Sequence, residues 1–117
     1  MPLVVVVHAF GGYGRGGSWR VSVFDGVGDI GAVYPDGPVR LEERVEVEPL
    51  EVSWEWLENV SRVLDDLTNL EVIGDLQDGT RATIRCFDSS YWEVEASSAL
   101  EAALAGQFEL VERVVKP

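Results

Sequence analysis

Residues 81–96 constrain the fold more than any other part of this sequence. Two runs in which apolar and polar residues alternate, 81–87 and 91–96, flank the short polar stretch Asp88-Ser89-Ser90. Alternation with a period of two is typical of half-buried β-strands, and a loop of three residues can reverse the chain between them. The sequence therefore predicts a β-hairpin here, and with it an antiparallel sheet.

The length of that loop also predicts the register of the hairpin. The predicted cross-strand pairs are Phe87 with Tyr91, Arg85 with Glu93, and Thr83 with Glu95. An aromatic pair and an opposite-charge pair then lie on one face of the sheet, and cross-strand pairs of these two kinds stabilise a register.

Three further segments predict strands. Residues 3–10 are a continuous valine-rich run, which is typical of a strand buried on both faces. Residues 18–24 alternate, with Trp19, Val21 and Val23 on the core side. Residues 39–47 have the most regular period of two in the chain, and their core side is Val39, Leu41, Val45 and Val47.

Two helices are predicted. Ser53 can cap the first, in which apolar residues recur at helical spacing as far as Leu67. The segment Ser98-Ala99-Leu100-Glu101 matches a capping box and opens the second, which Gly106 ends. Residues 108–115 fit a last strand better than continued helix. The element order predicts an α+β fold, a single antiparallel β-sheet with two helices packed on one face, in one domain spanning residues 1–117.

The charge of the chain is large, negative and uneven. Twenty-one acidic against nine basic side chains give a formal net charge of -12. This disfavours direct binding to nucleic acid or to anionic membranes, which attract positive proteins. A hydrophobic fraction of 46% excludes a disordered acidic tail. No apolar run reaches the ~20 residues that a membrane helix needs, and a single cysteine excludes a disulfide scaffold, so we expect a cytoplasmic protein.

The acidic side chains concentrate in the middle of the sequence. Residues 39–78 hold twelve acids against three arginines, a net charge of -9. If the polar face of the 39–47 strand lies beside the next helix, six glutamates form one negative field. They are Glu42, Glu46, Glu48, Glu51, Glu55 and Glu58. Such a field steers a partner with a basic surface, although an ordinary solvated face has the same composition.

A glycine-rich segment, 11–17, separates the first two predicted strands. It matches G-x-G-x-x-G, but a dinucleotide site needs a helix to follow, and here a strand pattern follows. The segment is therefore expected to be a hairpin loop. Tyr13, Arg15 and Trp19 are of the types that dominate binding hot spots, so the loop is also a candidate contact with a partner.

Within this loop, Gly11-Gly12-Tyr13 after a first strand resembles the Gly-Gly-aromatic turn of emfourin-type bacterial protein inhibitors of metalloproteases. The predicted element order is also similar to theirs. The chain departs from that family in its additional glycines up to Gly17 and in a long insertion over residues 25–48. The resemblance implies an inhibitor, and it assigns no inhibitory residue.

Nothing in the sequence predicts catalysis. His8 is the only histidine and falls on the core side of the first predicted strand, and no nucleophile motif accompanies it. One histidine and one cysteine, Cys86, cannot make a structural zinc site. We therefore expect no enzyme activity, no catalytic residue, no cofactor and no metal.

Two functions remain open. The first is a non-enzymatic acidic binding protein that neutralises a partner protein, as an immunity protein or inhibitor does, through the six glutamates and the Tyr13–Trp19 loop; mimicry of DNA is one form of it. The alternative is a structural or accessory subunit of an oligomer that associates through apolar, tryptophan-bearing surface. The sequence does not predict the oligomeric state.

Overall fold

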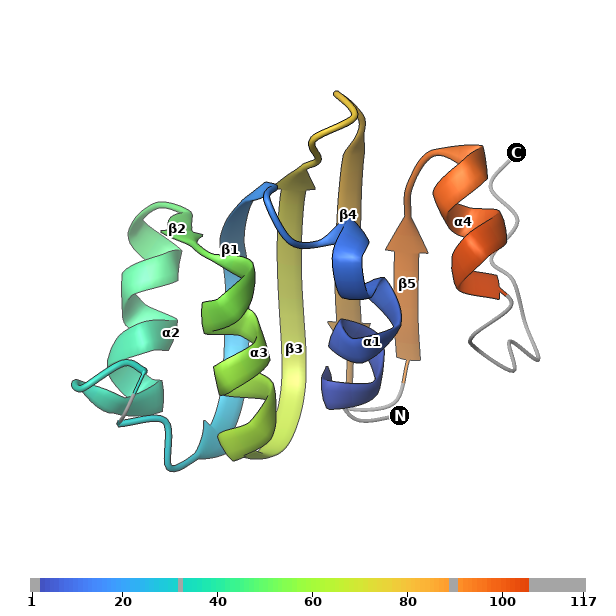
Figure 1. The fold of residues 1–117 in the computed structure, drawn as a ribbon. Helices are drawn as coiled ribbons and strands as arrows, with labels where there is room; N and C mark the ends of the chain where they lie inside the picture. Colours follow the sequence, from blue (N-terminus) through green and yellow to red (C-terminus); the bar gives the residue numbers. More distant parts are fainter. Residues whose placement is uncertain (1–2, 32, 89–90, 106–117) are drawn as a thin grey trace.

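Within the residues that the structure describes, five strands and four α-helices follow one another in irregular order. The computed structural model describes residues 3–31, 33–88 and 91–105. In chain order the elements are α1 (Leu3–Phe10), the short 3-10 helix η1 (Gly11–Tyr13), β1 (Ser18–Gly28), α2 (Gly37–Val47), β2 (Leu50–Val52), α3 (Trp54–Val63), β3 (Leu64–Asp75), β4 (Arg81–Phe87), β5 (Tyr91–Glu95) and α4 (Ser98–Ala105). The strands form one antiparallel sheet in the order β2-β1-β3-β4-β5 (Figure 1). The predicted α+β class with a single antiparallel sheet is confirmed.

The hairpin of β4 and β5 has the predicted register. Phe87 pairs with Tyr91, Arg85 with Glu93 and Thr83 with Glu95. The rings of Phe87 and Tyr91 lie with their centroids 6.0 Å apart. The hairpin is predictable because the residues that set its register are close neighbours in the sequence.

The prediction of a strand over residues 3–10 was wrong, because this run forms helix α1. Its buried residues include Leu3, Val6, Val7 and Phe10, a spacing of three, four and seven residues that defines one side of a helix. Val4, Val5 and His8 are exposed on the other side, so His8 is not a core residue. An apolar run this short is compatible with a strand and with a helix, and the elements that it packs against determine which of the two forms.

The prediction of a strand over residues 39–47 was also wrong, because they belong to helix α2. Leu41 and Val45, one helical turn apart, are buried. Val39 and Val47 were predicted to face the core, but they are 65% and 81% exposed. Pro38 lies in the first turn of α2, where proline favours a helix start, and this signal outweighs the apparent period of two.

Helix α3 begins where the sequence predicted and ends early. The Trp56 amide donates a hydrogen bond of 3.0 Å to the hydroxyl of Ser53, which caps the helix. The chain then passes without a loop from Val63 into β3, and Asp65 and Asp66 become exposed strand residues. The sequence had predicted helix as far as Leu67 and no strand between Leu67 and Arg81, so the long strand β3 was missed.

Strand β1 is correctly predicted as a strand, but one side chain points the other way. Its register against β3 shifts between Val21 and Val23. Val21 and Phe24 are buried on either side of this irregularity, whereas Val23 is 44% exposed. An extra residue in one strand reverses the alternation that follows it, so Val23 leaves the core.

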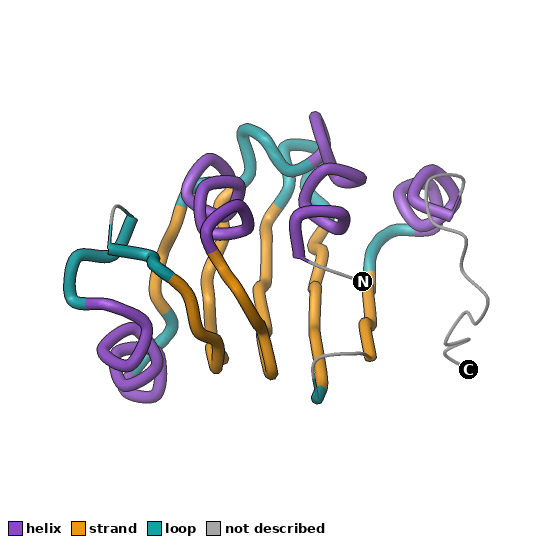
Figure 2. The backbone as a smooth tube through the Cα atoms, turned by 90° about the horizontal axis from the view of Figure 1, so that it is seen from below, coloured by secondary structure: helices purple, strands orange, loops and turns teal. Residues whose placement is uncertain are grey.

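The core lies between the sheet and the two helices α1 and α3. Phe10 of α1, Trp19 of β1 and Trp54 of α3 contact one another, with ring centroids 4.8 to 6.1 Å apart. Figure 2 shows α1 and α3 along one face of the sheet, which we name the covered face. Two helices thus pack on this face, but they are α1 and α3, whereas the sequence predicted α3 and the helix that begins at Ser98 as the pair and a strand over residues 3–10.

On the opposite face of the sheet, which we name the open face, no helix of the described residues crosses the centre. In Figure 2, α2 lies on this other side, at the end of the sheet where it contacts β1.

Helix α4 follows β5 at the other end of the sheet, and its first turn is capped by Ser97 rather than by the predicted Ser98. The Leu100 amide donates to the Ser97 hydroxyl at 3.3 Å, and the Ala96 amide donates to the Glu101 carboxylate at 3.3 Å. Gly106 and residues 108–115 lie outside the described residues.

Candidate functional site

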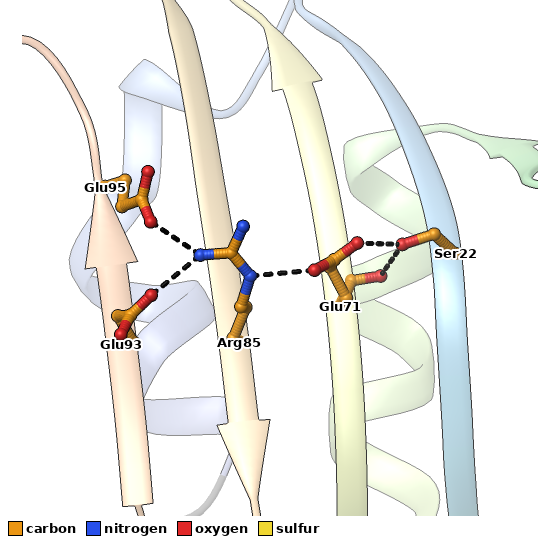
Figure 3. A network of polar contacts seen from close by, with 5 residues as sticks. All are labelled: Ser22, Glu71, Arg85, Glu93 and Glu95. Atoms are coloured by element: carbon orange, nitrogen blue, oxygen red, sulfur yellow. Dashed lines mark hydrogen bonds and ion pairs between the residues drawn. The ribbon is translucent and has the colours of Figure 1, made fainter.

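Arg85 is the centre of an ion network on the open face. Its Nε donates to Glu71 at 2.7 Å, and its Nη1 donates to Glu93 at 2.7 Å and to Glu95 at 2.6 Å (Figure 3). The three carboxylates come from the two strands that flank β4. In Figure 3 these side chains all project from the side of the sheet that faces away from α1. One guanidinium therefore ties three strands together across the open face.

The network is half-buried, and it stays negative. The side chains of Glu71, Arg85 and Glu93 are 27%, 25% and 18% exposed. The pKa of Glu71 is lowered from its ordinary value, first by the hydrogen bond from the Ser22 hydroxyl and then by that from Arg85. The same carboxylates raise the pKa of Arg85. Three anions around one cation leave a charge of -2.

A second ion cluster, further along the open face, is balanced by cations. Asp75 accepts hydrogen bonds from Arg81 at 3.0 Å and from Arg20 at 3.1 Å. Arg81 first and Arg20 second lower the pKa of this aspartate. Because two arginines meet one carboxylate, this end of the face offers little to a basic partner.

A cleft lies between the Arg85 network and helix α2. Its volume is about 300 Å³, and residues of α2, β1, β3 and β4 line it. Apolar side chains, among them Val23, Val45 and Phe87, share the lining with polar ones. Its carboxylates are Asp25, Glu42, Glu46 and Glu71, and its cation is Arg85. The cleft is thus apolar in part and acidic at several points.

The predicted field of six glutamates does not form as one surface. Glu42 and Glu46 lie at the cleft beside the open face. Glu55 and Glu58 lie on α3, which belongs to the covered face, and Glu51 lies on the edge strand β2. Glu48 follows α2 and pairs with Arg44 at 3.4 Å. The prediction of a single patch was wrong, because 39–47 is a helix and not a strand beside α3.

The glycine-rich segment does not form the predicted hairpin loop, and two of the three candidate contact residues are exposed. It joins helix α1 to β1, so it is not a hairpin loop. Tyr13 is 52% exposed, and the Arg15 side chain is 66% exposed and lies 3.7 Å from Glu58. Trp19 is 1% exposed, and its indole donates to the Gly14 carbonyl at 2.8 Å. Trp19 is a core residue, and its prediction as a contact residue was wrong.

Some features of the site were not predicted from the sequence. The Arg85–Glu93 pair was predicted, but Glu71 was not placed beside it, because β3 was missed. Phe87 and Tyr91 were paired correctly, yet their exposure of 42% and 45% went unrecognised. Their position on the same face as the Arg85–Glu93 pair was the signal that could have marked this face as a site.

Neither a metal centre nor a membrane helix occurs in the part of the chain that the structure describes. No group of three or more His, Cys, Asp or Glu side chains has an arrangement that could hold a metal ion in these ranges. None of the helices in the same ranges is both long enough and apolar enough to cross a bilayer. Cys86 is buried in β4, on the same side of the strand as the buried residues Ala82 and Ile84.

Comparison with known proteins returns no match among family models, curated proteins or solved structures. The resemblance of Gly11-Gly12-Tyr13 to the emfourin-type turn assumed a strand before it, and the structure has helix α1 there. The function must therefore be argued from the site itself.

Proposed function

We propose that this chain is a non-enzymatic acidic binding protein of the immunity-protein or inhibitor type, which neutralises a basic partner protein by holding it against the open face. One observation carries the proposal. The cleft and the Arg85 network together hold six carboxylates and one guanidinium, a net charge of -5. The carboxylates are Asp25, Glu42, Glu46, Glu71, Glu93 and Glu95.

The apolar groups on this face favour a protein as the partner. Val23, Phe87 and Tyr91 are each more than 40% exposed, and the first two line the cleft. Aromatic side chains are enriched at the centres of protein interfaces, and complementary charge raises the association rate and selects the partner. A surface that combines exposed aromatics with net negative charge fits a protein surface with basic and apolar residues.

The alternative, a structural or accessory subunit of an oligomer that associates through apolar, tryptophan-bearing surface, loses the exposed tryptophans that motivated it. Trp19 and Trp54 are buried. Trp56 is half-buried and donates to the Val33 carbonyl at 3.0 Å, and Trp92 is half-buried against the core. The four tryptophans therefore serve the fold, and the open face is the better candidate interface.

The test is affinity for a partner identified by capture from the native host and then purified. Reversing two charges at the cleft, Glu42→Lys with Glu46→Lys, should weaken binding at least tenfold at low ionic strength, because oppositely charged side chains now face the partner. Added salt should weaken binding by the wild type and reduce the difference in affinity between the wild type and this double variant.

The matched control reverses two glutamates of α3, on the covered face, Glu55→Lys with Glu58→Lys. It makes the same change in net charge and should cost far less affinity. The proposal is wrong if both double variants weaken binding equally, because the net charge of the protein and not the open face then determines the affinity. It is also wrong if affinity does not respond to salt.

A further inference from the structure

On the basis of this proposed function, we infer that the cleft between α2 and the open face receives a single long basic side chain of the partner, a lysine or an arginine. Its aliphatic stem would lie against Val23 and Phe87, and its charged group would lie among the carboxylates of the cleft.

The pairing of charges on α2 is the main reason. Two other glutamates of this segment each have an arginine: Glu43 of α2 lies 3.2 Å from Arg40, and Glu48, which follows α2, lies 3.4 Å from Arg44. Glu42 and Glu46, one turn apart, line the cleft and make no ion pair with the described residues. Asp25, across the cleft on β1, is likewise not in an ion pair within the described ranges. Three carboxylates at one cleft are therefore available to an external cation.

Arg85 does not make the cleft repel cations. Its guanidinium is held by Glu71, Glu93 and Glu95 at distances of 2.6 to 2.7 Å, so its charge is more than balanced. A fixed guanidinium in this position also occupies Glu71, which leaves Glu42 and Glu46 as the acceptors for the partner.

The composition of the cleft selects an amphipathic side chain. Its apolar lining includes Val23, Val45 and Phe87, and its carboxylates lie on α2 and on β1. Lysine and arginine bury an aliphatic stem on apolar surface and keep the charged end at polar groups. The face of an aromatic ring such as that of Phe87 adds attraction for the cation.

The size of the cleft limits what enters it. Pockets for small molecules span roughly 300–1,000 Å³. A cleft of about 300 Å³ is at the lower end of that range, which suits one long side chain and not a folded element. The rest of the partner would then lie over the open face, where Tyr91 is exposed.

The experiment titrates the ¹⁵N-labelled full-length chain with N-acetyl-arginine amide and with N-acetyl-lysine amide, followed by amide chemical shifts. Binding in the cleft should shift the amides of Val23, Glu42, Glu46 and Phe87 most. N-acetyl-citrulline amide has nearly the same shape as the arginine probe without its charge, and should bind at least fivefold more weakly.

Two double variants, one at the glutamates of the cleft and one at the glutamates that pair with Arg40 and Arg44, provide the comparison. Glu42→Gln with Glu46→Gln should weaken binding of the cationic probes at least fivefold. Glu43→Gln with Glu48→Gln removes the same charge from the paired glutamates, and should leave probe binding within twofold of wild type. Equal weakening by both pairs, equal binding of citrulline, or shifts spread over the whole surface would each overturn the inference.

A polyamine is the other carrier of a cation on an aliphatic chain. The assignment to a protein side chain would be overturned if spermidine bound at least tenfold more tightly than both amides and if Glu42→Gln with Glu46→Gln weakened its binding by the same factor.

The proposed function and the side-chain inference can fail independently of each other. If an identified partner binds through Glu42 and Glu46 but neither amide binds, the side-chain inference is wrong and the proposed function stands. If the amides bind as expected but the partner's affinity ignores the open face, the proposed function is wrong.

Discussion

Arg85 offers the sharpest test of how the open face is held together. Its guanidinium donates to Glu71, Glu93 and Glu95 across three strands. Replacing Arg85 by glutamine keeps much of the stem and a polar end, but removes the charge and the reach of the guanidinium. The three carboxylates lose this common cation, and they then repel one another.

The cost can be estimated from the three contacts. A hydrogen bond to a charged group contributes about 1.5–3 kcal/mol, and removing one member of a buried ion pair costs about 3–5 kcal/mol. The side chains here are 18% to 37% exposed, so water replaces part of what is lost. The three contacts also share one guanidinium and are not additive. We expect Arg85→Gln to lower the free energy of unfolding by about 3 kcal/mol at neutral pH.

The pH dependence has a definite sign. In the folded wild type, the pKa of Glu71 lies below its ordinary value of 4.5 because of Ser22 and Arg85. A lowered pKa contributes stability that is present above 4.5 and is lost as the pH falls through the folded pKa. Arg85→Gln removes one of the two causes and adds repulsion, so it raises the pKa of Glu71. The difference in stability between wild type and variant should therefore shrink as the pH falls below about 4.5.

Urea unfolding followed by tryptophan fluorescence measures this difference, because Trp19 and Trp54 lie in the core. The control is Arg81→Gln, which breaks the contact with Asp75 at an arginine that is 65% exposed, and it should have a much smaller effect. A loss below about 1 kcal/mol for Arg85→Gln at pH 7, or the same loss at pH 7 and pH 4, would refute this account of the network.

Two further predictions concern the core and the third helix. In Gly74→Ala, the new Cβ would lie 2.5 Å from the ring of Trp19, so the variant should lose about 2–3 kcal/mol in urea unfolding. Gly12→Ala, where a Cβ meets nothing within 4 Å, should stay close to wild type, and equal losses would contradict the packing of Trp19 on β3. Ser53→Ala removes the hydroxyl that accepts from the Trp56 amide and should cost about 1 kcal/mol, whereas Ser53→Asp should retain most of the stability. An unchanged unfolding midpoint in Ser53→Ala would show that the cap is not needed.

The parts of the fold that could be predicted depend on near neighbours in the sequence. The register of β4 and β5 follows from a short loop and from pairs of matching side chains. The start of α3 follows from a serine that can accept from the helix it precedes. Both signals act between residues a few positions apart, so they are visible without the rest of the molecule.

The secondary-structure predictions were wrong where packing against elements distant in the sequence determines whether a segment becomes helix or strand. The run Leu3–Phe10 is apolar at nearly every position, so it supplies a buried side for a helix and for a strand equally well. It becomes a helix beside α3, with Phe10 packed on Trp19 and Trp54. Strand β3 was missed for a related reason: α3 runs into it without a glycine or proline to mark the boundary.

The structure of residues 39–47 also decides which charges a partner can meet. As a strand, this segment would have placed Glu42, Glu46 and Glu48 on one solvated side. As the helix α2, it places Glu43 and Glu48 with Arg40 and Arg44, and it leaves Glu42 and Glu46 at the cleft. The number of acidic side chains, twenty-one, is therefore a poor guide to recognition, because several of these carboxylates already have a cation within the chain. A basic partner responds to carboxylates that have no counter-ion among the described residues, and around α2 the helical period separates these carboxylates from the paired ones.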